Sequence, residues 1–140
     1  MVKAALQSAG AIILSLVIAV VLAAALEGLS AILHPWPADF AGTSEEIAMQ
    51  VETYPAWVLA LLGGGGWGGT MFVSAWLATR LGTRRKTIHG YSVGLILIAA
   101  VIFNISMLPY PVWFSLLNLV VLPAALYLGV RLGRAKQESA

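Results

Sequence analysis

Apolar residues occur along the chain in four long runs that are separated by short polar segments. A helix needs about 20 apolar residues to cross the hydrocarbon core of a bilayer, so each run is long enough to span it. The runs predict transmembrane helices at about residues 5–33, 54–79, 90–108 and 112–132. We therefore expect an all-α membrane protein, a four-transmembrane-helix bundle that forms one domain over residues 1–140.

The first connection, residues 34–53, carries four of the six acids and no Lys or Arg. Pro35 ends the first run, because proline lacks a hydrogen-bond donor and clashes with a continuing helix. Thr43 and Glu46 have the three-residue spacing of a capping box. We predict a short surface helix at about 44–52 within a polar external loop.

The basic residues fix the expected orientation. With four spans, all eight lie on one side of the membrane: Lys3, Arg80, Arg84, Arg85, Lys86, Arg131, Arg134 and Lys136. Five of the six acids lie at or beyond the opposite ends of the spans. The positive-inside rule then predicts that both termini are cytoplasmic.

A second interpretation of the first run stays open. Lys3, the apolar stretch and Ala23-Ala24-Ala25 are similar to a secretory signal with a small-residue cleavage site. Cleavage would leave three spans and an external N-terminus. The run continues past the alanines and exceeds the ~7–15 residues of a signal's apolar region, which favours an uncleaved first span.

Composition agrees with a lipid environment. The chain is 60% hydrophobic and 10% charged, whereas soluble domains carry about 25% charged residues. There is no cysteine, which excludes disulfides, thiolate nucleophiles and cysteine metal sites. The positive charges lie beside the spans, so we predict the lipid bilayer as partner and no nucleic acid.

Six glycines occur within the seven residues from Gly63 to Gly69, near the middle of the second span. Each glycine lowers helix stability by about 1 kcal/mol relative to alanine. Another favourable contribution must therefore offset this loss. Two G-x-x-x-G pairs predict close helix packing, within the bundle or between protomers. These pairs are Gly64 with Gly68 and Gly65 with Gly69. The alternative is a broken helix whose free backbone groups line a midplane site.

The second and fourth spans begin and end with similar residues. Each opens with Tyr-Pro-x-Trp and closes on Arg-Leu-Gly, with 26 residues from Tyr to Arg in the second span and 21 in the fourth. A duplication would give a parallel repeat about an axis along the membrane normal. The ordinary preferences of these residue types at interfaces and helix ends explain the likeness equally well.

Polar side chains of three spans gather in the outer half, while the inner halves are almost wholly apolar. Glu27 is the one acid inside an apolar run, and an intramembrane carboxylate is costly unless it faces an interior or a cavity. Ser30 and His34 follow it on the same helical face. The candidate ligand-binding residues are Glu27, Ser30, His34, Asn104, Ser115 and Asn118.

These residues match no established reaction centre. The chain has no H-E-x-x-H, G-x-S-x-G or nucleotide-binding loop. Glu27 and His34 are too few ligands for a convincing metal site. We predict no catalytic residue, no metal and no cofactor.

Three segments resemble a family of small bacterial four-span proteins that is described as uncharacterised membrane proteins. They are Glu27 with His34-Pro35, Ala78-Thr79-Arg80-Leu81, and Asn104 with Pro109-Tyr110-Pro111-Val112-Trp113-Phe114. The family often has Pro-His-Pro before Trp-Phe, and Tyr110 stands at that histidine position here. The resemblance implies a bacterial inner-membrane location and no known reaction.

Three functional hypotheses follow. The leading one is a non-enzymatic bundle, a homo-oligomer or an accessory subunit of a larger membrane complex, whose outer polar cluster binds a small ligand or a partner. The second is a proton-coupled small-molecule transporter using Glu27. Small multidrug transporters are similar to it in architecture alone, since their first-helix glutamate lies at mid-span. The third is an intramembrane enzyme using Glu27 and His34.

Overall fold

The structure is a computed structural model that describes residues 2–83 and 85–135. Its helices are α1 (Val2–Leu33), α2 (Ser44–Glu52), α3 (Ala56–Leu59), the π-helix η1 (Ala60–Trp67), α4 (Gly68–Leu81), α5 (Lys86–Met107) and α6 (Val112–Ala135). The segments α3, η1 and α4 follow one another without a break. Four helices are long and apolar enough to cross a membrane, namely α1, the continuous helix over Ala56–Leu81, α5 and α6. The predicted all-α four-span fold is confirmed.

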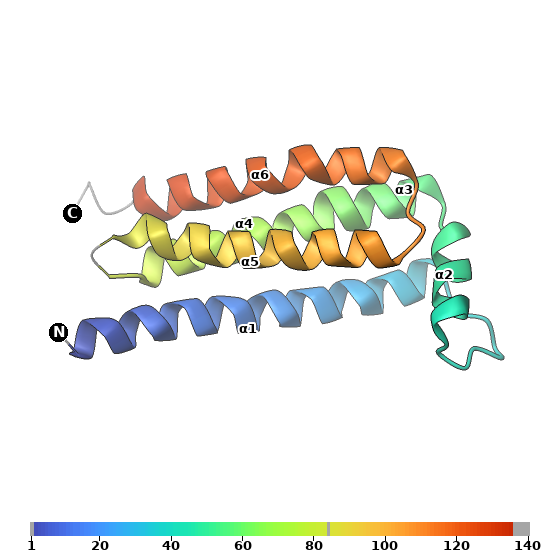
Figure 1. Ribbon diagram of the computed structural model, residues 1–140, viewed down its shortest axis with the longest axis horizontal. Helices are drawn as coiled ribbons and strands as arrows, with labels where there is room; N and C mark the ends of the chain where they lie inside the picture. Colours follow the sequence, from blue (N-terminus) through green and yellow to red (C-terminus); the bar gives the residue numbers. More distant parts are fainter. Residues whose placement is uncertain (1, 84, 136–140) are drawn as a thin grey trace.

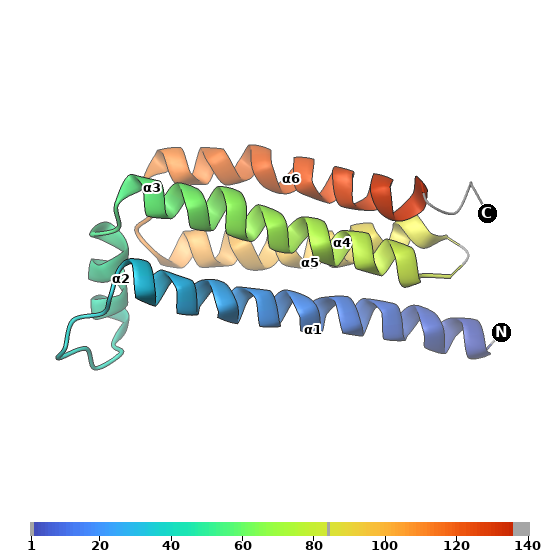
Figure 2. The same cartoon turned by 180° about the vertical axis from the view of Figure 1, so that it is seen from behind.

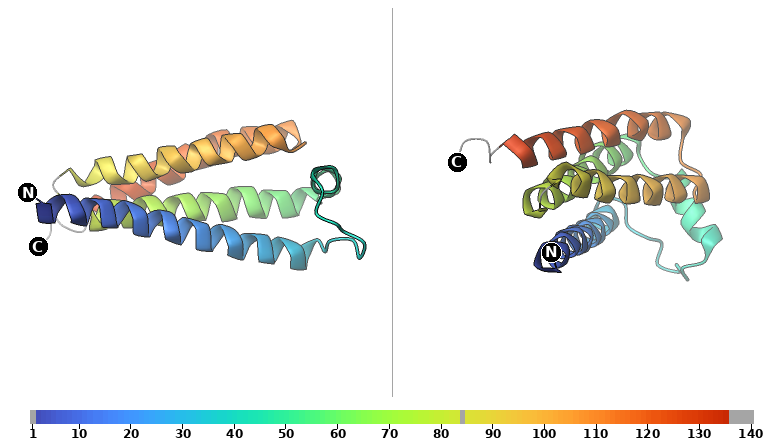
Figure 3. Two further views of the ribbon diagram at one scale, coloured as in Figure 1. Left: turned by 60° about the horizontal axis from the view of Figure 1, so that its bottom comes forward. Right: turned by 60° about the vertical axis from the view of Figure 1, so that its left-hand side comes forward.

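The spanning helices run up and down in chain order, so the start of α1 and the end of α6 lie at the same end of the bundle (Figure 1). We call this the basic end, because Lys3, Arg80, Arg85, Arg131 and Arg134 lie toward it. The opposite end is the α2 end, where α2 lies across the bundle (Figures 1 and 3). Seen from behind, α4 lies between α1 and α6 (Figure 2).

The predicted surface helix is confirmed as α2. Thr43 is its N-cap, and both hydrogen bonds of the capping box are present. The Glu46 carboxylate accepts from the Thr43 backbone N–H at 3.0 Å, and this bond lowers the pKa of Glu46. The cap satisfies N–H groups that have no partner inside the helix.

Two spanning helices extend beyond the predicted spans. α5 begins at Lys86 rather than near residue 90, and α6 continues through Gly133 to Ala135. A helix does not have to end where the hydrocarbon does, because its next turns can lie among headgroups. Gly82 follows the last residue of α4 as its C-cap, whereas Gly133 lies inside α6. The two Arg-Leu-Gly segments therefore occupy different structural positions.

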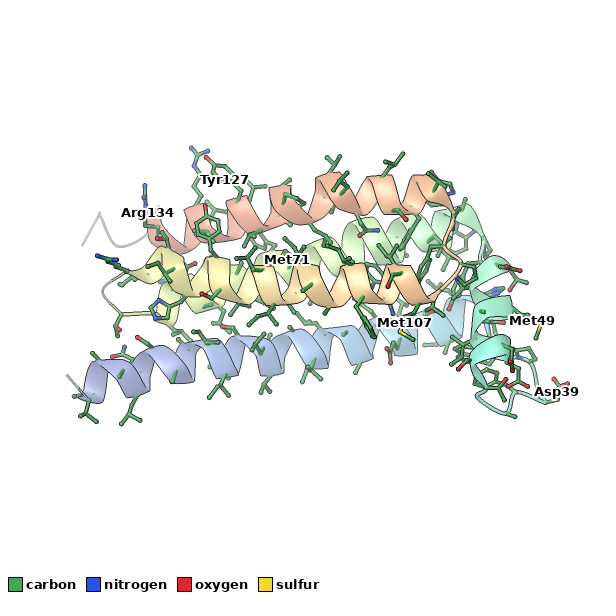
Figure 4. All side chains as sticks on the ribbon, viewed as in Figure 1. Asp39, Met49, Met71, Met107, Tyr127 and Arg134 are labelled. Carbon is green, nitrogen blue, oxygen red and sulfur yellow. The ribbon has the colours of Figure 1, made fainter. Side chains whose placement is uncertain are left out.

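α4 is the central helix, because it packs against α1, α5 and α6. The main apolar cluster, with Met71 inside the bundle (Figure 4), consists of Met71, Ala75, Leu122, Leu126 and Val130. Gly129 of α6 lies so close to α4 that an added Cβ would be 2.6 Å from the Phe72 carbonyl oxygen. Close backbone approach of this kind stabilises helix pairs in lipid, where burial of apolar surface gives little gain.

α1 is peripheral and apolar on all sides. Ala11, Ser15, Ala19 and Ser30 are its buried residues and lie on one stripe. Most of its large apolar side chains stay exposed, as expected of a helix that lipid surrounds. At the basic end, the Thr83 hydroxyl donates to the Ala4 carbonyl at 3.2 Å. Ser8 Oγ lies 2.6 Å from Thr83 Oγ1, so the α4–α5 loop is attached to α1.

Candidate functional site

The polar residues at the end of α1 contact the segment between α2 and α3. The Ser30 hydroxyl is hydrogen bonded to the Tyr54 hydroxyl, and the His34 and Tyr54 rings lie 4.6 Å apart. His34 Nε2 is 2.9 Å from Thr53 Oγ1. The Thr53 hydroxyl donates its single proton to the Gln50 carbonyl at 2.8 Å. It therefore accepts from His34, which places the ring proton on Nε2.

Gln50 completes this connection. Its side chain is buried, and the amide donates to the carbonyls of His34 and Pro35, each at 3.2 Å. These carbonyls follow the last residue of α1 and have no helical partner there. The contacts fix α2 onto the end of α1 and leave His34 with a structural role.

Three aromatic side chains pack between η1 and the hairpin that joins α5 to α6. Tyr110 and Phe114 are stacked with ring centroids 4.6 Å apart. Trp67 meets Tyr110 edge-on at 6.0 Å and Phe114 at 5.3 Å. We call Trp67, Tyr110 and Phe114 the aromatic cluster. Its geometry is that of favourable aromatic pairs, and it connects η1 to the outer turns of α6.

Two buried amide oxygens lie in the half of the bundle toward the α2 end. Asn118 is 2% exposed, and its Nδ2 donates to the Phe114 carbonyl one turn earlier at 2.9 Å. Asn118 Oδ1 and Asn104 Oδ1 are buried, and neither has a hydrogen-bond partner among the described residues. A buried acceptor without a donor costs about 1–3 kcal/mol. Lipid tails supply no donor.

Glu27 lies on an exposed side of α1. It acts electrostatically on Tyr110, which belongs to the α5–α6 hairpin outside the spanning helices. Burial, with smaller contributions from charge at Tyr54 and at Glu27, raises the pKa of Tyr110 to about 12.

The six candidate residues do not form one site. Ser30 and His34 join the contacts with the α2–α3 segment. Asn104 of α5 is half-buried and Asn118 of α6 is buried, and the Oδ1 atom of each is buried. Ser115 is half-buried in the first turn of α6, beside the aromatic cluster. Glu27 and His34 are seven residues apart, which separates them by about 10 Å along α1.

The glycine block lies in two helical segments: Gly63–Gly66 belong to the π-helix η1, and Gly68 and Gly69 begin α4, which continues η1 without a break. Segments of π-helix are rare and frequently occur at functional sites. Gly63 lies directly under the aromatic cluster, where an added Cβ would clash with the Phe114 ring. A Cβ on Gly66 would lie 2.5 Å from the Leu26 side chain of α1. The block thus lets α1 and α6 approach the same segment from two sides.

The four glycines that were expected to pack face different ways. A Cβ on Gly68 would lie 2.6 Å from Val121 of α6, and one on Gly64 would be in ordinary contact with α6 at 3.6 Å. Gly65 and Gly69 are exposed. Nothing lies within 4 Å of a Cβ on Gly69, and Gly65 meets a side chain of its own helix. The first pair faces α6 and the second faces outward.

Sequence reasoning missed several polar residues in the half toward the basic end. Ser15, Ser74, Thr79 and His89 are buried there. Ser15 and Thr79 donate to carbonyls one turn earlier in their own helices, at 2.7 and 2.8 Å. Small residues four positions apart were the available signal, because they mark a face that another helix approaches.

The arrangement offers hydrogen-bond acceptors beside aromatic rings. In the part of the chain that the structure describes, no three His, Asp or Glu side chains gather as a metal site would require. Comparisons with protein-family models, with curated proteins and with solved structures find no significant match to this chain.

Proposed function

We propose that this chain is a non-enzymatic multi-pass protein of the bacterial inner membrane that binds a small ligand in its outer half. The observation that carries the proposal is the pair of buried amide oxygens, Asn104 Oδ1 and Asn118 Oδ1, without a donor in the described residues. Both lie toward the α2 end, which we expect to face the periplasm because the basic residues lie toward the other end.

The chemistry of this region favours a ligand that donates hydrogen bonds. A donor at Asn118 would remove the cost of an unsatisfied acceptor in apolar surroundings. The aromatic cluster beside Asn118 supplies the apolar contact area that small-molecule sites require. Glu27 adds negative charge near Tyr110. A small amine with an apolar body combines these properties.

The variant Asn118→Leu tests the binding role. Leucine has the same number of side-chain heavy atoms as asparagine, branched at the same carbon, and removes the unsatisfied oxygen. Native mass spectrometry of the chain, extracted in mild detergent from the membranes that contain it, should show a bound small molecule on the natural protein. The variant should lose this added mass.

Ser74→Ala is the matched control. It also removes a buried polar atom without a partner among the described residues, but in the half toward the basic end. It should keep the bound mass. Natural protein that carries lipid alone, or an Asn118→Leu variant that retains the ligand, would contradict the binding proposal.

Proton-coupled transport is the second candidate function, favoured by the position of the Glu27 carboxyl group inside the spanning helix α1. In proteoliposomes with a pH gradient, Glu27→Gln should abolish proton-driven uptake of an amine under this alternative. Under the binding role, the natural protein should bind the amine and show no proton-driven uptake.

A further inference from the structure

A cavity of about 290 Å³ lies between α5 and α6 at the basic end. It is lined by Thr87 and Tyr91 of α5 and by Tyr127, Val130, Arg131 and Arg134 of α6. Figure 4 marks Tyr127 and Arg134 along the last turns of α6. The aromatic cluster lies at the opposite end of the bundle, so this cavity is separate from the outer-half region.

The cavity concentrates positive charge, and none of the described residues that line it is acidic. Arg131 and Arg134 are exposed and stand three residues apart on one helix, a spacing at which like charges repel each other. The acids among the described residues are all remote from it, in the second half of α1 or in the segment that contains α2: Glu27, Asp39, Glu45, Glu46 and Glu52. An anion in the cavity would relieve the repulsion.

The remaining lining residues indicate an amphipathic ligand. Tyr91 is 42% exposed and Tyr127 is 53% exposed, while Val130 is buried at 3%. Tyrosine favours the headgroup region of a bilayer, because its ring is apolar and its hydroxyl can hydrogen bond to water. Leu95, one turn from Tyr91 toward the bundle middle, is 64% exposed. An apolar path therefore leads from the cavity along α5 into the hydrocarbon.

We propose that this cavity binds the phosphate headgroup of an anionic phospholipid. The two guanidinium groups pair with phosphate oxygens, because the planar fork of arginine matches phosphate geometry. Tyrosine and threonine hydroxyls donate further hydrogen bonds, and an acyl chain lies along Leu95. Basic pockets between transmembrane helices on the cytoplasmic side are suited to such headgroups. The assignment does not depend on what the outer half binds.

Native mass spectrometry with defined lipids tests this site. Phosphatidylglycerol and phosphatidylcholine, added separately to delipidated protein in detergent, should differ in affinity by about tenfold or more in favour of the anionic lipid. The double variant Arg131→Gln/Arg134→Gln should weaken phosphatidylglycerol binding by about 30-fold. Unchanged helical content by circular dichroism shows that the double variant is folded.

The double variant Lys3→Gln/Arg85→Gln is the charge-matched control. It removes two exposed positive charges from the same end, outside the cavity lining, and should weaken binding less than about threefold because screened charges act weakly at a distance. Equal losses in the two double variants would overturn the site, as would equal affinity for the two lipids. Inorganic phosphate should not displace the lipid. Displacement would identify soluble phosphate as the ligand and overturn the lipid assignment.

Discussion

α1 and α6 both pack against α4, but they are held in different ways. On α6, Gly129 and Gly133 lie against the α4 backbone, and a Cβ on either would come within 2.8 Å of a carbonyl oxygen. On α1, a Cβ added to Gly10 or Gly28 would have no neighbour within 4 Å among the residues that the structure describes. Burial of apolar surface gives little gain in lipid. The close packing of α6 on α4 instead supplies dispersion contacts along the helix.

α1 relies instead on hydrogen bonds at its two ends. Ser8 and Thr83 form one contact at the basic end, and Ser30 and His34 form others with Tyr54 and Thr53 at the α2 end. The middle of α1 contributes a stripe of small residues and the contact of Leu26 with Gly66. We therefore expect α4, α5 and α6 to form the stable unit, with α1 opening at lower free energy.

The largest effect is expected for Gly129→Val. The new side chain meets the Phe72 carbonyl and the Ala75 side chain of α4, and backbone atoms cannot move aside as a flexible side chain can. Overpacking of this kind lowers the free energy of unfolding by about 3 kcal/mol. Equilibrium unfolding in mixed micelles, followed by circular dichroism, measures the change.

The same substitution on α1 provides the control. Gly28→Val introduces the same atoms where no neighbour lies within 4 Å, and should change the unfolding free energy by less than about 1 kcal/mol. Equal destabilisation by the two variants would remove the distinction between α1 and α6.

A smaller effect is expected when the end contacts of α1 are removed. Ser8→Ala/Ser30→Ala deletes one hydrogen bond at each end, at about 0.6–2 kcal/mol per bond in a membrane. Hydrogen–deuterium exchange should rise along α1 and stay unchanged in α4 and α6. Ser106→Ala is the control, because this hydroxyl bonds to its own helix at the Phe103 carbonyl. Faster exchange in all four spans would contradict independent opening of α1.

The smallest effect concerns pH and Tyr110. Its pKa in the folded protein is raised from 10.0 to about 12, so the folded state holds this proton more tightly than the unfolded chain. Its contribution to stability is complete below pH 10 and is lost as pH rises toward 12. Thermal melts should show a decline over this range that Tyr110→Phe lacks. Glu27→Gln should lower the phenol pKa slightly, as read from ultraviolet absorbance. An unchanged Tyr110 pKa in this variant would show that the charge of Glu27 does not act on the hairpin.

The sequence was sufficient for the helices and insufficient for their contacts. Apolar runs of membrane-spanning length define four helices whatever their neighbours, and the capping box of Thr43 and Glu46 is a local interaction. Both predictions depend on residues close together in the chain. Neither requires knowledge of how one helix is rotated relative to the next.

The candidate site depends on that rotation. Glu27 and Ser30 share one turn of α1, yet the first is exposed and the second buried. The sequence pattern places Thr53 in the external loop and Tyr54 at the start of the second span. In the fold, Tyr54 is a partner of Ser30 and Thr53 is a partner of His34. The glycines differ in the same way, since a Cβ on Gly68 would meet Val121 of α6, whereas one on Gly69 would meet no described neighbour within 4 Å. Apolar residues on every side of a span leave the sequence pattern without a preferred face.

The π-helical geometry of η1 gives the glycine block one further consequence. Hydrogen bonds of the i→i+5 type include one more residue in each ring than those of an α-helix. Deleting a single glycine there would let the segment rewind as an α-helix with its hydrogen bonding intact. The portion above it would then keep nearly the same orientation about the axis relative to α4, because a π-helix turns less per residue and about seven α-helical residues turn as far as the eight of η1. Val58 and Leu59 would therefore stay on the buried face that they now occupy. The wider winding of η1 thus accommodates one additional residue without changing which face of the second span is buried.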